Sequence, residues 1–150
     1  MKYLSLILCF SSFSSMACPN LVGEYSVCRT KKNILIESTN LVVTETMNEG
    51  IKFIKFDTLP DGQNEREVTR YQITGKPIAK SWVSETGVKF ESVTTASCFL
   101  NTMKVQTTIL ADGEPYVNHA STIRKVGRTI VQESKGTIVR MAFDDVLTCY

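Results

Sequence analysis

The chain contains a single histidine, His119, which by type is the residue best suited to acid–base chemistry. A histidine acting as a general base needs a positioned nucleophile and an orienting carboxylate. Ser121, Ser134 and Asp144 supply those residue types, but no surrounding motif singles any of them out. A structural histidine is therefore the better interpretation. The sequence predicts no catalytic residue and a protein that is not an enzyme.

Asp144 and Asp145 are adjacent carboxylates, and paired carboxylates occur in acid–base and metal sites. Successive residues of a strand point to opposite faces, so we expect these two side chains to diverge and to lie in solvent. The four cysteines after residue 17 are separated by 9, 69 and 50 residues, which is not a metal-ligand spacing. With one histidine in the chain, we expect no metal site and no cofactor.

Residues 1–17 have the three parts of a secretory signal peptide. A positively charged start is followed by a short apolar run over residues 4–13 and by the small residues Ser15 and Ala17 at the cleavage site. A run of about ten residues is too short for a membrane-spanning helix, which needs roughly twenty. We predict cleavage after Ala17 and a secreted or periplasmic domain of residues 18–150 without a transmembrane segment.

Cys18 follows the predicted cleavage site directly, which leaves lipid attachment as an alternative. Lipidation signals normally carry Leu three residues before that cysteine, and Ser15 stands there instead. Lipidation of Cys18 would also leave an odd number of thiols in an oxidising compartment. Free secretion with two disulfide bonds is therefore the primary prediction.

The charge of the mature chain gives no indication of a nucleic-acid or membrane partner. Once the signal is removed, 16 basic and 15 acidic residues are spread along the sequence. This balance lacks the basic patch that binds nucleic acid or an anionic membrane. A length of about 133 residues suits one domain. We expect a monomer.

Apolar and polar residues alternate with period two along most of the chain, and turn residues interrupt the alternation at short intervals. This pattern is typical of β-strands, and no segment keeps helical spacing for three turns. The predicted strands are 22–29, 33–38, 41–47, 50–57, 66–74, 78–85, 88–96, 102–110, 115–125, 128–134 and 137–144.

Short sequential strands joined by tight turns favour an antiparallel up-and-down meander, in which neighbours pair in order. Closing the meander into a barrel of about 8–10 strands would remove its two exposed edges. A closed barrel is the primary prediction for this all-β domain. A β-sandwich is the alternative, with residues 58–66 as the one candidate for its long crossover connection.

Gly23 and Tyr25 open the first predicted strand. This opening resembles the Gly-x-Trp signature of lipocalins and related calycin barrels, with Tyr25 at the position of the tryptophan. The resemblance implies a small secreted barrel in which the glycine lets the chain turn beneath the barrel and the aromatic ring closes one end. The chain departs from the family in lacking a Thr-Asp-Tyr motif and a predicted helix near the C-terminus. The other interpretation of Tyr25 is a core aromatic residue.

Strand alternation also predicts which side chains face the core, given a turn at Lys135-Gly136. The expected buried side chains are Met103, Val105, Ile109, Val139, Met141 and Phe143, and the expected solvent-facing ones are Lys104, Gln106 and Arg140.

The cysteine pairing follows from the predicted barrel closure. If the first and last strands pair antiparallel, residue 22 lies near residue 144, and continuing both strands outward brings Cys18 to Cys149. Cys28 would then pair with Cys98. A bridge between Cys18 and Cys28 would need the chain to double back, because disulfide-bonded Cα atoms lie within roughly 7 Å.

Several strands mix hydroxyl side chains into an apolar face, which either packs a tapering barrel or lines a ligand cavity. The candidate ligand-lining residues are Tyr25, Trp82, Phe90, Thr94, Thr107 and Tyr116. The sequence favours a binding protein for a small apolar or amphipathic molecule. The alternative is an exported protein-binding module, such as a hydrolase inhibitor, that acts through the loop over residues 57–67.

Overall fold

The computed structural model describes residues 18–150, and the predicted signal peptide, residues 1–17, lies outside the described residues. The described chain is built from β-strands. None of its segments is a helix long and apolar enough to span a bilayer. The strands are β1 (Gly23–Tyr25), β2 (Cys28–Thr30), β3 (Ser38–Asn48), β4 (Ile51–Pro60), β5 (Glu67–Ile73), β6 (Pro77–Val83), β7 (Lys89–Phe99), β8 (Thr102–Ala111), β9 (Glu114–Val126), β10 (Thr129–Ile138) and β11 (Met141–Cys149).

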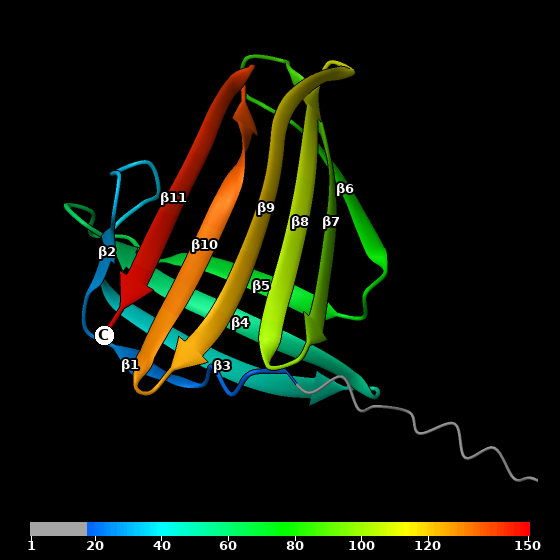
Figure 1. The fold of residues 1–150 in the computed structure, drawn as a ribbon. Helices are drawn as coiled ribbons and strands as arrows, with labels where there is room; N and C mark the ends of the chain where they lie inside the picture. Colours follow the sequence, from blue (N-terminus) through cyan, green and yellow to red (C-terminus); the bar gives the residue numbers. More distant parts are fainter. Residues whose placement is uncertain (1–17) are drawn as a thin grey trace, which may run out of the picture.

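Nine of these strands close into a barrel, in the order β3-β2-β11-β10-β9-β8-β7-β5-β4, and β4 returns to β3. β1 adds to β3 and β6 adds to β7, both outside this ring. Strands β7 to β11 form one layer, called the front layer, and β3 to β5 form a rear layer that crosses behind it at a steep angle (Figure 1). The all-β class and the closed barrel predicted from the sequence are confirmed.

The meander is interrupted at one place in the ring. β6 pairs antiparallel with β7 over its whole length, whereas β5 meets β7 in parallel at a single pair, Ile73 and Ala96. Every other neighbour in the ring is antiparallel. The barrel wall is therefore weakly paired between β5 and β7, as it also is between β2 and β3, which share the single pair Cys28 and Ser38.

The last hairpin differs from the prediction. Its turn lies at Val139-Arg140, where both residues have positive φ, as two-residue hairpin turns of type I′ require. The glycine of the predicted turn, Gly136, lies instead within β10, where an added Cβ would come within 1.9 Å of the Asn118 carbonyl oxygen. Gly136 is therefore needed for close backbone approach and not for a turn.

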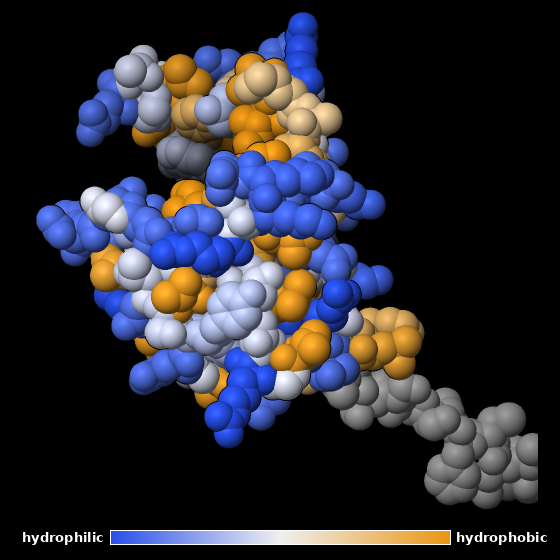
Figure 2. Space-filling model, turned by 60° about the vertical axis from the view of Figure 1, so that its left-hand side comes forward, coloured by the Kyte–Doolittle hydropathy of each residue, from blue (hydrophilic) through white to orange (hydrophobic). Residues whose placement is uncertain are grey.

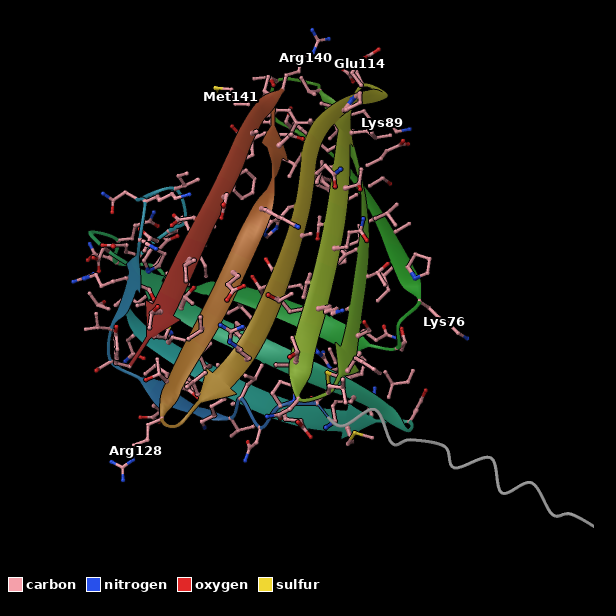
Figure 3. The ribbon with its side chains drawn as sticks, in the orientation of Figure 1. Lys76, Lys89, Glu114, Arg128, Arg140 and Met141 are labelled. Carbon is pink, nitrogen blue, oxygen red and sulfur yellow. A yellow bond between two sulfur atoms is a disulfide. The ribbon has the colours of Figure 1, made fainter. Side chains whose placement is uncertain are left out.

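The shifted turn changes the burial of the last predicted strand. Val139 and Met141 were expected in the core, but they are 53% and 71% exposed, and Phe143 is half-buried. Arg140 and Met141 extend from one end of the front layer (Figure 3). The other predicted segment keeps its register, since Met103 and Val105 are buried, Ile109 is half-buried, and Lys104 and Gln106 are exposed.

The first predicted strand is divided into two short ones that serve different neighbours. β1 pairs with β3, and after a bend β2 pairs with β11, where Cys28 lies directly opposite Cys149. The predicted disulfide pairing is therefore wrong. Cys28 is joined to Cys149, with Cα atoms 4.0 Å apart, and Cys18 is joined to Cys98 at the end of β7. The barrel does close between the start and the end of the chain, but in a register displaced from the expected one.

The buried core lies where the two layers cross. It contains side chains from β1 to β4 on one side and from β7 to β11 on the other. Its members are Leu21, Tyr25, Cys28, Leu41, Val43, Ile54, Ala96, Cys98, Met103, Val105, Ile123, Ile130 and Cys149.

Candidate functional site

A cavity of about 260 Å³ lies between the two layers, beside the core. One wall is formed by β3, β4 and β5, which contribute Leu41, Phe56 and Tyr71. The opposite wall comes from β9, β10 and β11, with Ile123 and Leu147 among its side chains. Such an apolar, concave site with a few polar groups is typical of small-molecule binding sites. We refer to it as the interlayer cavity.

Two aromatic residues shape the wall of the interlayer cavity on the rear layer. The rings of Phe56 and Tyr71 meet edge to face, with centroids 5.8 Å apart. Burial raises the pKa of Tyr71, so its hydroxyl stays protonated at neutral pH. The Tyr71 hydroxyl can therefore donate or accept one hydrogen bond without introducing a charge.

The rim of the interlayer cavity includes residues 31–37, the segment that joins β2 to β3. Leu35 and Ile36 line the cavity from this rim, and Ile36 is largely exposed to solvent. A strand was predicted over residues 33–38, but the segment is irregular up to Ser38. Its shape is fixed by contacts with a carboxylate from β11, described next.

Asp145 is fully buried. Its carboxylate fixes the rim by accepting hydrogen bonds from the backbone of the rim residues. The N–H groups of Lys32, Ile34 and Leu35 donate to the carboxylate at 2.8, 2.8 and 3.0 Å, and the N–H of Val146 donates at 2.8 Å. Burial alone would raise the pKa of Asp145, but these hydrogen bonds outweigh burial and lower the pKa to about 2. The expectation that Asp145 lies in solvent is therefore wrong, whereas Asp144 is exposed.

A chain of polar side chains extends from the interlayer cavity along the inner face of β9 and β10. The Nε2 amide of Gln132, a cavity-lining residue, donates to the hydroxyls of Ser121 and Ser134 at 3.2 and 3.1 Å. The two hydroxyls are 2.7 Å apart, and the Ser121 hydroxyl is also 2.7 Å from Nε2 of His119. The chain therefore links the cavity to the single histidine.

His119 has the surroundings of a structural histidine. Burial lowers the pKa of His119, which favours the neutral ring. In the neutral ring an unprotonated Nε2 can accept a hydrogen bond from the Ser121 hydroxyl. The imidazole also packs against Phe143, with ring centroids 5.7 Å apart. The structure brings His119, Ser121 and Ser134 together, but Asp144, the carboxylate considered with them, points to the opposite face of its strand from the buried Asp145.

Five of the six residues predicted to bind a ligand gather around β6, β7 and their neighbours. Trp82 stacks on Phe90 with ring centroids 5.3 Å apart, and Phe90 meets Tyr116 edge to face at 5.5 Å. The hydroxyls of Thr94 and Thr107 are hydrogen-bonded at 3.1 Å. Their role in binding stays a prediction.

Trp82 and Thr94 line a second hollow of about 450 Å³, here called the lateral groove, near the place where β5 and β7 share a single pair. Thr69 and Tyr71 line both the lateral groove and the interlayer cavity. The two spaces are therefore neighbours, with the Tyr71 side chain at their boundary.

Tyr25 lies apart from the other five predicted residues. It is 3% exposed in the core, and its hydroxyl donates to the Leu21 carbonyl oxygen at 2.9 Å. Its ring lies against Gly23, where an added Cβ would be 3.3 Å from the Tyr25 oxygen. Gly23 thus leaves room for the aromatic ring that follows it by two residues.

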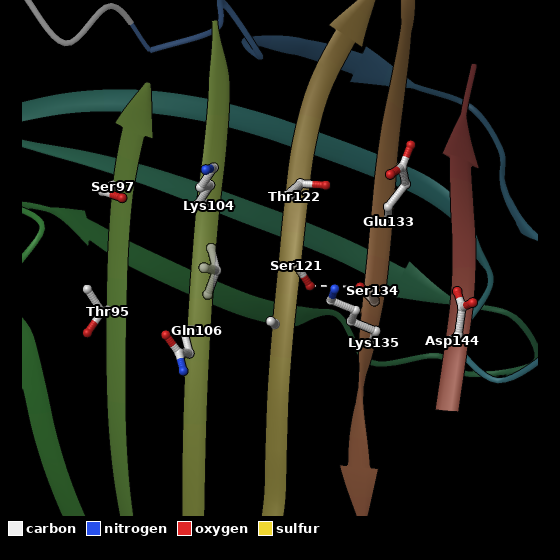
Figure 4. Close-up of a pocket in the computed structure, with 12 residues that line it drawn as sticks. Thr95, Ser97, Lys104, Gln106, Ser121, Thr122, Glu133, Ser134, Lys135 and Asp144 are labelled. Atoms are coloured by element: carbon white, nitrogen blue, oxygen red, sulfur yellow. Dashed lines mark hydrogen bonds between the residues drawn. The ribbon is translucent and has the colours of Figure 1, made fainter. Parts of the chain in front are cut away.

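The outer face of the front layer carries a third hollow, of about 490 Å³, whose lining is polar and charged (Figure 4). Lys104, Glu133, Lys135 and Asp144 contribute from β8, β10 and β11. The two carboxylates are engaged by basic residues outside the hollow, since Glu133 pairs with Arg124 at 2.7 Å and Asp144 with a lysine of the rim at 3.6 Å. Such an open, charged surface offers no enclosed site for an apolar molecule.

No protein-family model matches the sequence, and no curated protein matches it at the sequence level. Among solved structures, the chain is similar to the crystal structure of fatty-acid-binding protein 1 from Echinococcus granulosus, with a TM-score of 0.51. The match covers 86% of this chain and 95% of that chain, at 12% sequence identity. The likeness supports the closed β-barrel fold of this chain. At this identity the likeness concerns the fold alone, and it is compatible with the lipocalin-like barrel that the Gly23-x-Tyr25 opening resembles, whose finer type stays a prediction.

Sequence reasoning missed most of the lining of the interlayer cavity. Phe56, Tyr71 and Gln132 lie on separate strands, and only the crossing of the two layers brings them to one space. One signal for this site was present in the sequence, namely a polar residue on an apolar strand face. Gln132 is such a residue, because it shares its face of β10 with the buried Ile130. No group of His, Cys, Asp and Glu side chains in residues 18–150 could hold a metal ion.

Proposed function

We propose that the protein binds a small apolar or amphipathic molecule in the interlayer cavity. The observation that carries this proposal is the concave, mainly apolar space between the layers, bordered by Leu41, Phe56 and Leu147. Apolar surface is stabilised by removal from water at roughly 25 cal/mol for each Å². A ligand that places a hydrocarbon chain against these side chains gains that stabilisation.

The surface around the hollow is consistent with ligand entry. Hydrophobic residues, drawn in orange, border a notch on the face of the molecule shown in Figure 2. The rim residue Ile36 is 64% exposed, and on the neighbouring lateral groove Trp82 is 45% exposed. Exposed apolar side chains at the openings of a cavity favour contact with an apolar molecule before it enters.

The lateral groove gives a longer ligand somewhere to extend. It adjoins the interlayer cavity at Thr69 and Tyr71, and together the two spaces fall within the range of small-molecule sites, roughly 300–1,000 Å³. In this proposal, Trp82, Phe90 and Thr94 contact the part of the ligand outside the interlayer cavity. The likeness to a structure titled as a fatty-acid-binding protein supports the proposal through the fold.

We place this binding activity outside the cytoplasm. The two disulfide bonds are compatible with an oxidising compartment, where such bonds persist. The predicted signal peptide over residues 1–17 would deliver the chain there.

The proposal is tested by titrating the disulfide-bonded mature chain with Nile red, an uncharged probe that fluoresces in apolar surroundings. We expect saturable binding by the wild-type protein. Thr69→Trp fills the boundary between the interlayer cavity and the lateral groove, and it should weaken binding by about tenfold or more, equivalent to roughly 1.4 kcal/mol.

Thr46→Trp is the matched control, because Thr46 is an exposed residue of β3 that lines neither space. It should leave the affinity within about twofold of wild type, which is roughly 0.4 kcal/mol. Non-saturable fluorescence, or equal losses in both variants, would argue against binding in the interlayer cavity.

A further inference from the structure

The polar side chains that line the interlayer cavity are uncharged. Hydroxyls of serine, threonine and tyrosine and one amide provide the polar lining, from Ser38, Thr58, Thr69, Tyr71 and Gln132. Among residues 18–150, no Lys, Arg or His lines the space, and its one charged lining residue is the exposed Glu67. The cavity thus offers hydrogen bonds to a ligand but no positive charge.

The basic residues near the interlayer cavity lie outside its lining. Arg66 and Lys55 both bind the Asp57 carboxylate. The Arg70 guanidinium lies over the Phe53 ring, 4.0 Å from its centroid. Arg70 and Lys80 line the neighbouring lateral groove, but no cation of the described residues lines the interlayer cavity, where the head group is placed.

A ligand carboxylate would therefore lose its hydration in the cavity without gaining a counter-charge. Burial of an ionised carboxylate is costly unless a cation or several hydrogen bonds compensate for the lost water. The negative charge of Glu67 at the edge would add repulsion. An uncharged head group avoids both costs.

Gln132 is the polar residue best placed to recognise such a head group. Its Nε2 donates to the hydroxyls of Ser121 and Ser134 at 3.2 and 3.1 Å, so both N–H groups of the amide have partners. The amide oxygen is left to accept a hydrogen bond from a ligand. No buried side-chain polar atom among the described residues lacks a partner, so this oxygen, which has none, reaches accessible space.

The size of the cavity limits the buried part of the ligand. At roughly 30 Å³ for a water-sized group, 260 Å³ holds about nine groups of the size of a methylene. A medium-length chain with one small head group fits this volume.

We infer that the interlayer cavity selects an uncharged amphiphile over a carboxylate of the same chain length, and that the Gln132 amide oxygen accepts a hydrogen bond from a hydroxyl head group. This inference rests on the proposed function and specifies its ligand class. It assigns Gln132 the role of a specificity-determining residue, held in place by Ser121 and Ser134.

The inference is tested by calorimetric titration of the mature, disulfide-bonded protein at pH 7 with octanol, methyl octanoate and octanoate. The three ligands share a chain length, and octanoate alone is charged. We expect octanol and methyl octanoate to bind at least about tenfold more tightly than octanoate. Octanoate that binds as tightly as octanol would overturn the inference and leave the proposed function standing.

Gln132→Leu removes the amide and keeps a similar side-chain volume. It should weaken octanol binding about five- to tenfold, because the hydrogen bond to the hydroxyl head group is lost. Gln106→Leu, at an exposed position on β8, is the control and should leave all affinities unchanged. An unchanged octanol affinity in Gln132→Leu would show that Gln132 does not recognise the head group. Failure of Nile red and of all three ligands to bind wild-type protein would defeat the proposed function itself.

Discussion

Asp145 connects the last strand to the rim of the cavity through a single buried carboxylate. Three of its four hydrogen-bond donors belong to residues 32–35, more than a hundred positions away in the chain. These N–H groups lie outside any strand, so they have no backbone partner in a β-sheet. The carboxylate accepts the hydrogen bonds that a neighbouring strand would accept if residues 33–38 formed a strand. The shape of the rim therefore depends on one residue of β11.

Asp145→Asn should destabilise the fold by about 2–4 kcal/mol, because the amide has one acceptor atom in place of two and no charge for the N–H groups. Urea unfolding of the variant and wild type measures this difference. Asp144→Asn is the control, since Asp144 is exposed and makes only a long ion pair, and it should change stability by less than about 0.5 kcal/mol. Equal effects of the two substitutions would contradict the assignment.

The same comparison has a defined pH dependence. The folded-state pKa of Asp145 is about 2, below its ordinary value of 3.8, so the carboxylate contributes stability fully above about pH 4. That contribution is lost as pH falls towards 2. The difference in stability between wild type and Asp145→Asn should therefore shrink over this interval. A difference that is constant with pH would mean that the charge of Asp145 does not stabilise the rim.

Two methionines distinguish the observed register from the one expected from alternation. Met103 is fully buried, whereas Met141 is 71% exposed. Met103→Ala should cost about 2–5 kcal/mol, the range for truncating a buried methionine, and Met141→Ala less than about 0.5 kcal/mol. Thermal or urea unfolding of both variants gives the comparison. A large loss of stability in Met141→Ala would favour the turn at Lys135-Gly136 that the sequence predicted.

At the scale of elements, the alternation of the sequence was enough to locate most strands. The predicted 102–110 and 115–125 correspond closely to β8 and β9, because tight turns and a half-buried pleated surface leave a strong local signal. The errors arose where contacts distant in sequence decide the structure. Gly136 looks like a turn residue, but its role is close approach to β9, and residues 33–38 are shaped by Asp145.

The disulfide connectivity required the order of the strands and could not be read from the spacing of cysteines. The bend between β1 and β2 sends the first strand to β3 and the second to β11, so Cys28 rather than Cys18 faces Cys149. Non-reducing peptide mapping should recover a Cys28–Cys149 peptide and a Cys18–Cys98 peptide. Replacing Cys28 and Cys149 together by Ser should lower stability by about 2–5 kcal/mol. Recovery of a Cys18–Cys149 peptide would contradict the observed barrel closure.

At the scale of the whole molecule, two crossed layers enclose a space that no single segment of sequence describes. The residues predicted to bind a ligand lie mostly beside the lateral groove, because aromatic and hydroxyl residues near β6 and β7 give the clearest local pattern. The lining of the interlayer cavity is drawn from both layers and from the rim. Ordinary aliphatic residues make up much of it, and these carry no sequence signal for function.

Methyl-resolved NMR of the mature protein during titration with octanol tests most directly whether a ligand occupies the interlayer cavity. The methyl groups of Leu41, Ile123, Ile130 and Leu147 line the cavity from both layers. The account predicts that their signals shift most and saturate together, while those of Val83 and Val139, exposed and outside the cavity lining, stay in place. Shifts confined to exposed valines, or the absence of any saturable shift at the four cavity residues, would contradict it.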